Sequence, residues 1–203
     1  RQVKGIVGGP VGDTGLTDLG RAQATALRDR LLRRKVHVDG VFSSPLRRVI
    51  ETVEIVLPAL GSLEVVAQDD LGYQWPAHSD GMTWEEHQRR FAVPGGGIFR
   101  PYEAGEESWA AFVSRVGAAF AEISCRCAGR TAVVFTHEEM IDASFRVFGD
   151  GSLRGPFNVC VTPVSLTEWT TQDDPLGGGP PEWKLPRWRL ERFNDAAHLE
   201  QLA

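Results

Sequence analysis

The chain has 203 residues, of which 42% are hydrophobic and 24% are charged, and its formal net charge is −5. This composition is typical of a globular protein that is long enough to bury a sizeable core. The acidic balance lacks the basic footprint of nucleic-acid binding, and no apolar stretch approaches the length of a membrane span. We therefore expect neither nucleic acid nor a membrane as a partner.

The three cysteines predict neither a disulfide framework nor a metal site. Cys125, Cys127 and Cys160 are odd in number, and one residue separates the first two. No cluster of histidines and cysteines at zinc spacing accompanies them, so we expect no metal. We expect all three to be reduced, two near a helix end and one in a strand, in a cytoplasmic protein.

The first third of the chain alternates between helix and strand patterns. A glycine-rich loop over residues 1–16 precedes a helix that Thr17 caps and that runs to about Lys35. Residues 36–43 have the pattern of a short buried strand. Pro45 is a favourable first-turn residue for a second helix, which we expect to reach about Leu60, ahead of a strand at 63–67.

The middle segment, residues 69–104, is irregular and long enough to be a lid or substrate loop, with one short helix near 83–90. A helix over 107–125 follows it. Residues 130–136 are a continuous apolar run of the kind that buried parallel strands show, and a helix follows His137.

The C-terminal part changes character. Residues 159–170 and 182–192 predict two strands around a loop rich in glycine and proline, which is typical of an antiparallel hairpin at a sheet edge. The whole pattern predicts one domain over residues 1–203. Its class is three-layer α/β/α, with a mostly parallel sheet and a C-terminal antiparallel hairpin.

Reactive polar residues occur where two predicted strands end and the next helices begin, at 43–48 and at 136–139. In open α/β sheets, ligands bind outside the carboxyl ends of the strands, where helix N-termini attract anions. A first-turn arginine adds a planar, permanently charged fork that matches phosphate. Arg48 or His137 alone would be an ordinary surface or helix-terminal residue. Together, each directly after a buried strand, they predict a pocket for a phosphate monoester.

These residues belong to a series of motifs in which the chain resembles the histidine phosphatase superfamily, also called the phosphoglycerate-mutase-like fold. The motifs occur in order over nearly the whole chain: Gly15-Leu16-Thr17-x-x-Gly20-x-x-Gln23-Ala24, Ser43-Ser44-Pro45-Leu46-x-Arg48-x-x-x-Thr52, Glu107-Ser108 with Arg115, Val133-Val134-Phe135-Thr136-His137, and Asn194-Asp195-x-x-His198-Leu199. The second motif is fairly specific for this superfamily, and the occurrence of all five motifs in order is strong evidence for the resemblance.

The resemblance implies a mechanism that uses no metal and no other cofactor. A histidine in an Arg-His-Gly motif attacks the phosphorus and forms a phosphohistidine, which splits one difficult step into two. Arginines and a second histidine neutralise the phosphoryl oxygens, and a carboxylic acid protonates the leaving oxygen. By this resemblance Arg48 is one arginine and His137 is the second histidine, while Gln2, Gly8 and Gly9 belong to the phosphate-binding segment.

The first departure from the family pattern concerns the nucleophile. No Arg-His-Gly motif occurs from Arg1 onward, and we expect it a few residues upstream, on a first strand that the resemblance places centrally in the sheet. Losing such a strand would expose two inner strand edges. A truncated, non-catalytic protein is the less favoured alternative.

The second departure concerns the proton donor. Tyr73 occupies the place of the family's acidic glutamate, and a tyrosine with an ordinary pKa of about 10 is a poor acid. Glu138 directly follows the second histidine, an arrangement that resembles the phytase-like branch, where the acidic residue at this place donates the proton. We expect Glu138 to take that role, with Asp80 as the fallback donor and Tyr73 and Asp80 as lid contacts. An ordinary first-turn acid, favoured by the helix dipole, is an equal alternative for Glu138.

The sequence therefore predicts a phosphatase that hydrolyses a small phosphorylated metabolite through a phosphohistidine. A phosphoglycerate-type mutase is less favoured, because the segment 69–104 has no cluster of cations beyond Arg89, Arg90 and Arg100 to hold a second anionic group. A non-catalytic phosphate-binding module of the same fold is the other alternative. The sequence decides neither the substrate nor the oligomeric state, and it is compatible with a homodimer.

Overall fold

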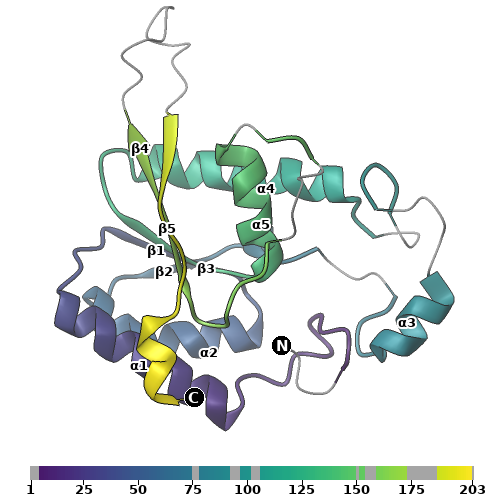
Figure 1. The fold of residues 1–203 in the computed structure, drawn as a ribbon, viewed down its shortest axis with the longest axis horizontal. Coiled ribbons are helices and arrows are strands. Elements are labelled where there is room, and N and C mark those ends of the chain that lie inside the picture. The colour runs from purple at the N-terminus through teal and green to yellow at the C-terminus, as the bar shows by residue number, and fades with distance from the viewer. Residues whose placement is uncertain are drawn as a thin grey trace, which may run out of the picture.

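The structure is a computed structural model that describes residues 5–74, 78–91, 97–101, 106–149, 151–153, 159–172 and 187–202. In this part of the chain a parallel sheet lies between two layers of helices (Figure 1). Helices α1 (Asp18–Arg34) and α2 (Arg47–Val56) cover one face, and α4 (Trp109–Arg126) and α5 (Glu138–Phe148) cover the other. The predicted three-layer α/β/α class is confirmed.

The parallel sheet has β1 (Gly40–Ser43) between β2 (Val65–Ala67) and β3 (Ala132–Phe135). The two pairings align the three strands closely, because Val41 of β1 lies opposite Val65 of β2 and Val133 of β3. All three strands are parallel, so their carboxyl ends lie at one edge of the sheet. This edge is where the sequence predicts a ligand.

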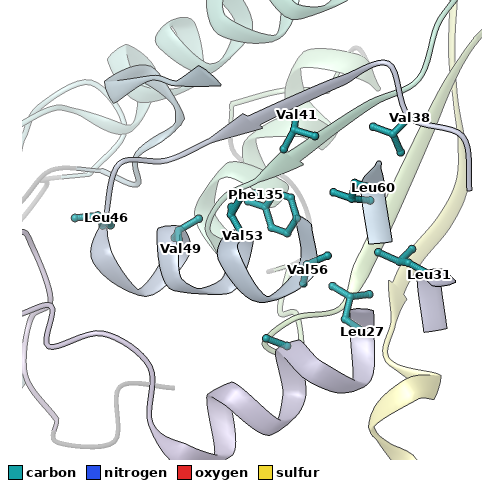
Figure 2. Packing of buried hydrophobic residues seen from close by; sticks show 11 residues of the cluster. Leu27, Leu31, Val38, Val41, Leu46, Val49, Val53, Val56, Leu60 and Phe135 are labelled. Atoms are coloured by element: carbon teal, nitrogen blue, oxygen red, sulfur yellow. The ribbon is translucent and has the colours of Figure 1, made fainter. Parts of the chain in front are cut away.

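Side chains of the sheet alternate between the two helix layers, as the strand period of two requires. Val41, Val65 and Val133 pack into the cluster formed with α1 and α2, and the residue after each of them packs toward α4 and α5. Figure 2 shows the first cluster, with the side chains of α2 between the sheet and α1. Its buried members include Leu27, Leu31, Val41, Val49, Val53, Val56, Leu60 and Phe135.

The helix boundaries follow from local capping. Thr17 caps α1 by accepting a hydrogen bond from the backbone N–H of Gly20 at 3.1 Å, and the helix ends where Lys35 adopts a left-handed conformation with φ of 50°. Ser108 caps α4 through the N–H of Ala111, so this helix starts at Trp109 and not at 107 as predicted. The predicted helix 45–60 is divided into α2 and a 3-10 helix, Leu57–Leu60.

The C-terminal strands β4 (Leu166–Gln172) and β5 (Arg187–Asp195) form an antiparallel pair, as predicted, but the pair is a separate sheet and not an edge of the parallel one. Aromatic contacts hold it to α5, because Phe148 stacks on Trp188 with ring centroids 4.0 Å apart and also contacts Trp169. The pair is therefore attached to the rest of the domain by side-chain packing on α5, and not by hydrogen bonds to the edge of the parallel sheet as predicted.

Several predicted strands are longer than the observed ones. The strand predicted at 36–43 begins only at Gly40, because the left-handed Lys35 turns the chain before it. The strand predicted at 159–170 begins at Leu166, since Val164 has φ of 64° and the N–H of Ser165 closes a turn on the carbonyl of Thr162. Cys160 therefore lies outside a strand, and all three cysteines are free.

The short helix predicted near 83–90 is α3 (Trp84–Phe91). Gln2 lies outside the described residues, as do 75–77, 92–96 and 102–104 of the predicted lid and 182–186 of the predicted hairpin. Within the described ranges, no helix has the length and apolar character needed to cross a membrane.

Candidate active site

The two residues predicted to form the pocket meet at the carboxyl edge of the parallel sheet. Arg48 lies in the first turn of α2 after β1, and His137 follows β3 as the N-cap residue of α5, with an extended backbone at φ −118° and ψ 163°. Nη2 of Arg48 lies 3.1 Å from Nδ1 of His137. The parallel pairing of β1 with β3 brings the two turns together, because both strands end at the same edge.

His137 is held in one neutral form by its two hydrogen-bond partners. An arginine only donates, so Nδ1 accepts from Arg48, and Nε2 then carries the proton and faces Oγ of the fully buried Ser44 at 2.9 Å. Burial of the imidazole, followed by the charge of Arg48, lowers the pKa of His137 to about 3. In the unliganded site the histidine is therefore neutral, and the positive charge belongs to Arg48.

Arg48 is anchored on one side of its guanidinium. Nη1 donates to the carbonyl of Gly8 at 3.3 Å and lies 3.3 Å from a carboxylate oxygen of Asp13. The guanidinium also lies over the ring of Tyr73, 5.4 Å from its centroid, where the electron-rich face favours a cation. The side chain keeps about a quarter of its surface exposed (28%), so an anion can still reach it.

The predicted phosphate-binding segment forms a tight turn against Asp80. Gly8 and Gly9 are buried, and a Cβ at Gly9 would lie only 2.4 Å from the Asp80 carboxylate. Oδ2 of Asp80 accepts from the N–H of Val11 at 2.8 Å, and Oδ1 accepts from that of Gly12 at 2.9 Å. Both oxygens thus act as acceptors that shape the turn, which argues against Asp80 as a proton donor.

The start of the described chain is paired with the base of the predicted lid. The N–H of Val7 donates to the carbonyl of Met82 at 2.7 Å, and the N–H of Gly81 donates back to Val7 at 2.8 Å. Ile6 and Thr83 form an antiparallel bridge beside them. Residues 81–84 are therefore held next to the segment that carries Gly8, and the sequence did not indicate this pairing.

Tyr73 lies beside both central residues, at a ring distance of 5.3 Å from His137. Burial is the main cause that raises the pKa of its hydroxyl, so Tyr73 is an even poorer acid than a free tyrosine. Its backbone is fixed by Arg115, which pairs with Glu107 through two hydrogen bonds of 3.0 and 2.8 Å and also donates to the carbonyl of Tyr73 at 3.3 Å.

The two acidic residues after His137 differ in their surroundings. Both Glu138 and Glu139 are exposed at the first turn of α5. Desolvation by the surrounding chain is the main cause that raises the pKa of Glu139, the charge of Glu138 raises it further, and Arg48 opposes the shift. Glu139 also acts electrostatically on Tyr73. Glu139 is among the reactive polar residues at 136–139, but its sequence position alone did not single it out as a candidate acid.

Three other histidines of the chain lie in different settings. His37 is exposed and pairs with Asp39 at 3.2 Å, His87 contacts aromatic residues on α3, and His198 belongs to a C-terminal network around Arg30. Among the residues that the structure describes, no group of three or more His, Cys, Asp or Glu side chains is arranged to hold a metal ion.

The family model of the histidine phosphatase superfamily (branch 1) matches residues 2–176, which is most of the chain. The chain belongs to the histidine phosphatase superfamily.

One curated relative and several solved structures are similar to the chain over most of its length. Phosphoglycerate mutase-like protein 4 of Arabidopsis thaliana is 25% identical over 203 positions, covering 93% of this chain and 78% of that protein. A structure named mycobacterial hydrolase 1 is 24% identical with a TM-score of 0.75, over 95% of this chain and 92% of its own. Native mycobacterial glucosyl-3-phosphoglycerate phosphatase is 22% identical with a TM-score of 0.75, over 95% and 93%. These structures share the fold of this chain.

The superfamily ending has a structural role in this chain. Asp195 accepts two hydrogen bonds from Arg30 of α1, at 2.8 and 2.5 Å, and a third from Arg192 at 2.8 Å. His198 accepts from Arg30 at 3.1 Å, and its other nitrogen faces the carbonyl of Val164 at 3.0 Å. This ending therefore ties the C-terminus to α1 and contributes no described group to the contacts of Arg48 and His137.

Proposed function

We propose that this protein is a phosphatase that hydrolyses a small-molecule phosphate monoester. The observation that carries the proposal is the contact of Arg48 with His137 at the carboxyl edge of the sheet. Arg48 supplies a permanent positive charge, and N–H groups of Nη2 and Nε point away from the Nη1 anchor on Gly8 and Asp13. Such a group stabilises the charge that develops on phosphoryl oxygens during transfer.

We further propose that the reaction passes through a phosphohistidine. A histidine nitrogen attacks the phosphorus, the bond to the leaving oxygen breaks, and that oxygen takes a proton from an acid. Water then attacks the phosphohistidine, releases inorganic phosphate and returns the histidine. We assign His137 the role of the second histidine, because its Nε2 carries a proton that it can donate to a phosphoryl oxygen in place of Ser44. We assign the attack to the histidine of the superfamily's Arg-His-Gly motif, which does not occur in residues 1–203.

Two features of the described chain leave a place for a further strand beside β3. Within the described residues, β3 is hydrogen-bonded only to β1, although its run of apolar residues resembles that of a strand with neighbours on both sides. The antiparallel pair of β4 and β5 is also a separate sheet. A further parallel strand beside β3 would supply the missing neighbour and would deliver a histidine to the same carboxyl edge as His137.

For the proton donor we propose a carboxyl group of the first turn of α5. Glu138 is the residue that the phytase-like resemblance indicates. Glu139 is the residue whose pKa is raised, which keeps its carboxyl protonated to higher pH. Both follow His137 directly in the chain, so either lies on the element that presents the second histidine to the phosphate.

The decisive experiment uses the full-length protein with a generic aryl phosphate. We expect hydrolysis that R48A and H137A each reduce by about a hundredfold or more, the range of a lost charge-stabilising group. Brief reaction with a labelled substrate should trap an acid-labile, base-stable phosphoenzyme. Wild-type protein that neither hydrolyses the ester nor binds phosphate would overturn the proposal, and isomerisation of phosphoglycerate without net hydrolysis would favour the mutase.

One other candidate function is a non-catalytic phosphate-binding module, because Tyr73 stands in the place of the superfamily's acidic glutamate. In such a protein the proton donor has been lost while the cation that binds phosphate remains. Phosphate binding that depends on Arg48, together with no turnover of any ester by the full-length protein, would identify it. We propose a cytoplasmic location for either function, which the three free cysteines support.

A further inference from the structure

Helix α2 begins without a side-chain cap from its own sequence. The residue at its N-cap position is Leu46, whose side chain accepts no hydrogen bond. The cap is supplied from a distant part of the chain, because Oδ2 of Asp13 accepts the backbone N–H of Arg48 at 3.0 Å across 35 residues. An uncapped helix N-terminus leaves several N–H groups without partners, so this contact stabilises the turn that carries Arg48.

The same carboxylate also holds the side chain of Arg48. Oδ2 of Asp13 lies 3.3 Å from Nη1, and the Asp13 side chain is almost fully buried, with 3% of its surface exposed. Its other oxygen accepts the N–H of Gly15 at 2.9 Å, which fixes the carboxylate in the loop. Asp13 therefore holds both the backbone and the guanidinium of one residue.

The contact of Asp13 with Nη1 determines which N–H groups of the Arg48 guanidinium are left for a ligand. Nη1 donates to the carbonyl of Gly8 and forms an ion pair with the carboxylate of Asp13, so this corner of the guanidinium is held by the protein. Nη2 contacts His137 with one N–H and has a second, and Nε makes no hydrogen bond to the described residues. Phosphate oxygens can therefore reach the edge formed by Nε and Nη2, which lies beside His137.

We propose that Asp13 is a positioning residue that fixes Arg48 so that its Nε and Nη2 edge faces the phosphate next to His137. The inference rests on the proposed function, since it specifies how the phosphate-binding arginine of that site is aimed. Asp13 touches no substrate in this scheme and acts only through Arg48. Its loss is then expected to weaken phosphate binding by about tenfold or more, because small displacements of positioning groups have large effects on rate and binding.

A purely structural role in the loop is the alternative, and Glu51 provides a matched control for it. Oε2 of Glu51 accepts the N–H of Leu16 at 2.9 Å, just as Asp13 accepts that of Gly15. Glu51 also pairs with Arg21 at 2.7 Å and Arg47 at 2.9 Å, but in the described part of the chain its carboxylate forms no hydrogen bond or ion pair with Arg48. Removal of Glu51 therefore loosens the same loop without touching the arginine.

The test is a double-mutant cycle on the full-length protein, with inorganic phosphate as the probe and 31P NMR titration into the millimolar range. We expect D13A to weaken phosphate binding about tenfold when Arg48 is present and less than twofold in an R48A background. E51A should have the same effect in both backgrounds. Equal effects of D13A with and without Arg48 would overturn the inference.

Two further measurements separate this inference from folding defects and from failure of the proposed function. D13N keeps one acceptor oxygen, which can still take the backbone N–H of Arg48, but it loses the negative charge beside Nη1 and the acceptor for Gly15. It should therefore fold better than D13A and still show Arg48-dependent weakening. The 15N signals of His137 report the Arg48 contact without any phosphate. D13A should shift the Nδ1 signal of His137, which accepts from Arg48, and E51A should leave it unchanged. An unchanged His137 in D13A would overturn the inference even if the protein is a phosphatase, whereas a changed His137 in a protein that binds no phosphate would overturn the proposed function alone.

Discussion

Nη2 of Arg48 and Nδ1 of His137 lie 3.1 Å apart although 89 residues separate them in the chain. The two strands that precede them run in parallel and side by side, so both loops reach one edge of the sheet. Arg48 stays positively charged at every working pH. Burial and the charge of Arg48 together keep His137 neutral. The site therefore has a strong cation and a neutral partner before a phosphate arrives.

The low pKa of His137 predicts a specific pH dependence of stability. Between its ordinary pKa of 6.5 and its folded value of about 3, the unfolded chain binds a proton that the folded chain does not. The free energy of unfolding must therefore decrease as the pH falls below 6.5, by about 2 kcal/mol at pH 5 from this residue. Urea titrations of wild type and H137Q at pH 8 and pH 5 measure it, and parallel losses in the two proteins would contradict the prediction.

Substitutions of Glu138 and Glu139 form a matched pair that locates the proton donor. The donor must be protonated to act, so kcat for an ester with a poor leaving group should decline as the pH rises through the donor's pKa. We expect E138Q to lower kcat about a hundredfold and to remove this decline, as the phytase-like resemblance implies. E139Q, which removes the carboxyl with the raised pKa, is the comparison. If E139Q abolishes the decline and E138Q does not, the assignment of the donor moves to Glu139.

The leaving group provides a control for the same pair. An aryl phosphate with an acidic phenol needs little protonation as it departs, so the donor variant should lose much less activity toward it than toward an alkyl phosphate. A variant that is equally impaired with both substrates has lost phosphate binding or folding rather than proton donation.

The sequence predicted the central pair because its signals are local. Arg48 and His137 each follow a buried strand directly, and the parallel sheet then brings them together. The roles of Asp13 and Asp80 could not be predicted, because each carboxylate binds backbone N–H groups 35 to 69 residues away in the chain. The separate position of the β4 and β5 pair was missed for a related reason, since a strand pattern does not specify its neighbours.

The contact between Gly9 and Asp80 predicts a substitution whose effect depends on a second residue. A methyl group at Gly9 would lie 2.4 Å from the Asp80 carboxylate, so G9A should destabilise the fold by about 1 to 3 kcal/mol, as overpacking does. In a D80A background the obstructing carboxylate is absent, and G9A should then have little effect. Thermal unfolding of the four proteins measures the coupling, and additive effects would show that the strain has another source.

D80A by itself should impair phosphate binding more than folding. Its carboxylate holds the N–H groups of Val11 and Gly12, and the same turn presents the Gly8 carbonyl to Arg48. We expect KM for an aryl phosphate to rise about tenfold with a smaller change in kcat, because the loosened turn weakens binding of substrate and transition state alike. A loss in kcat alone, with KM unchanged, would instead support Asp80 as the proton donor.

The C-terminal network predicts a large effect on stability without an effect on chemistry. Arg30 is 8% exposed, and hydrogen bonds from Arg30 and then Arg192 hold the pKa of the Asp195 carboxyl well below its ordinary range. D195A would leave the buried Arg30 guanidinium without its carboxylate, which costs about 3 to 5 kcal/mol. The partly exposed pair of Arg28 and Asp29 offers the control, since D29A should change stability by less than about 1 kcal/mol. Calorimetry should show a much lower Tm for D195A but not for D29A. The kcat per folded molecule should stay at the wild-type value in both variants. A D195A protein as stable as D29A would show that the network does not hold the C-terminus to α1.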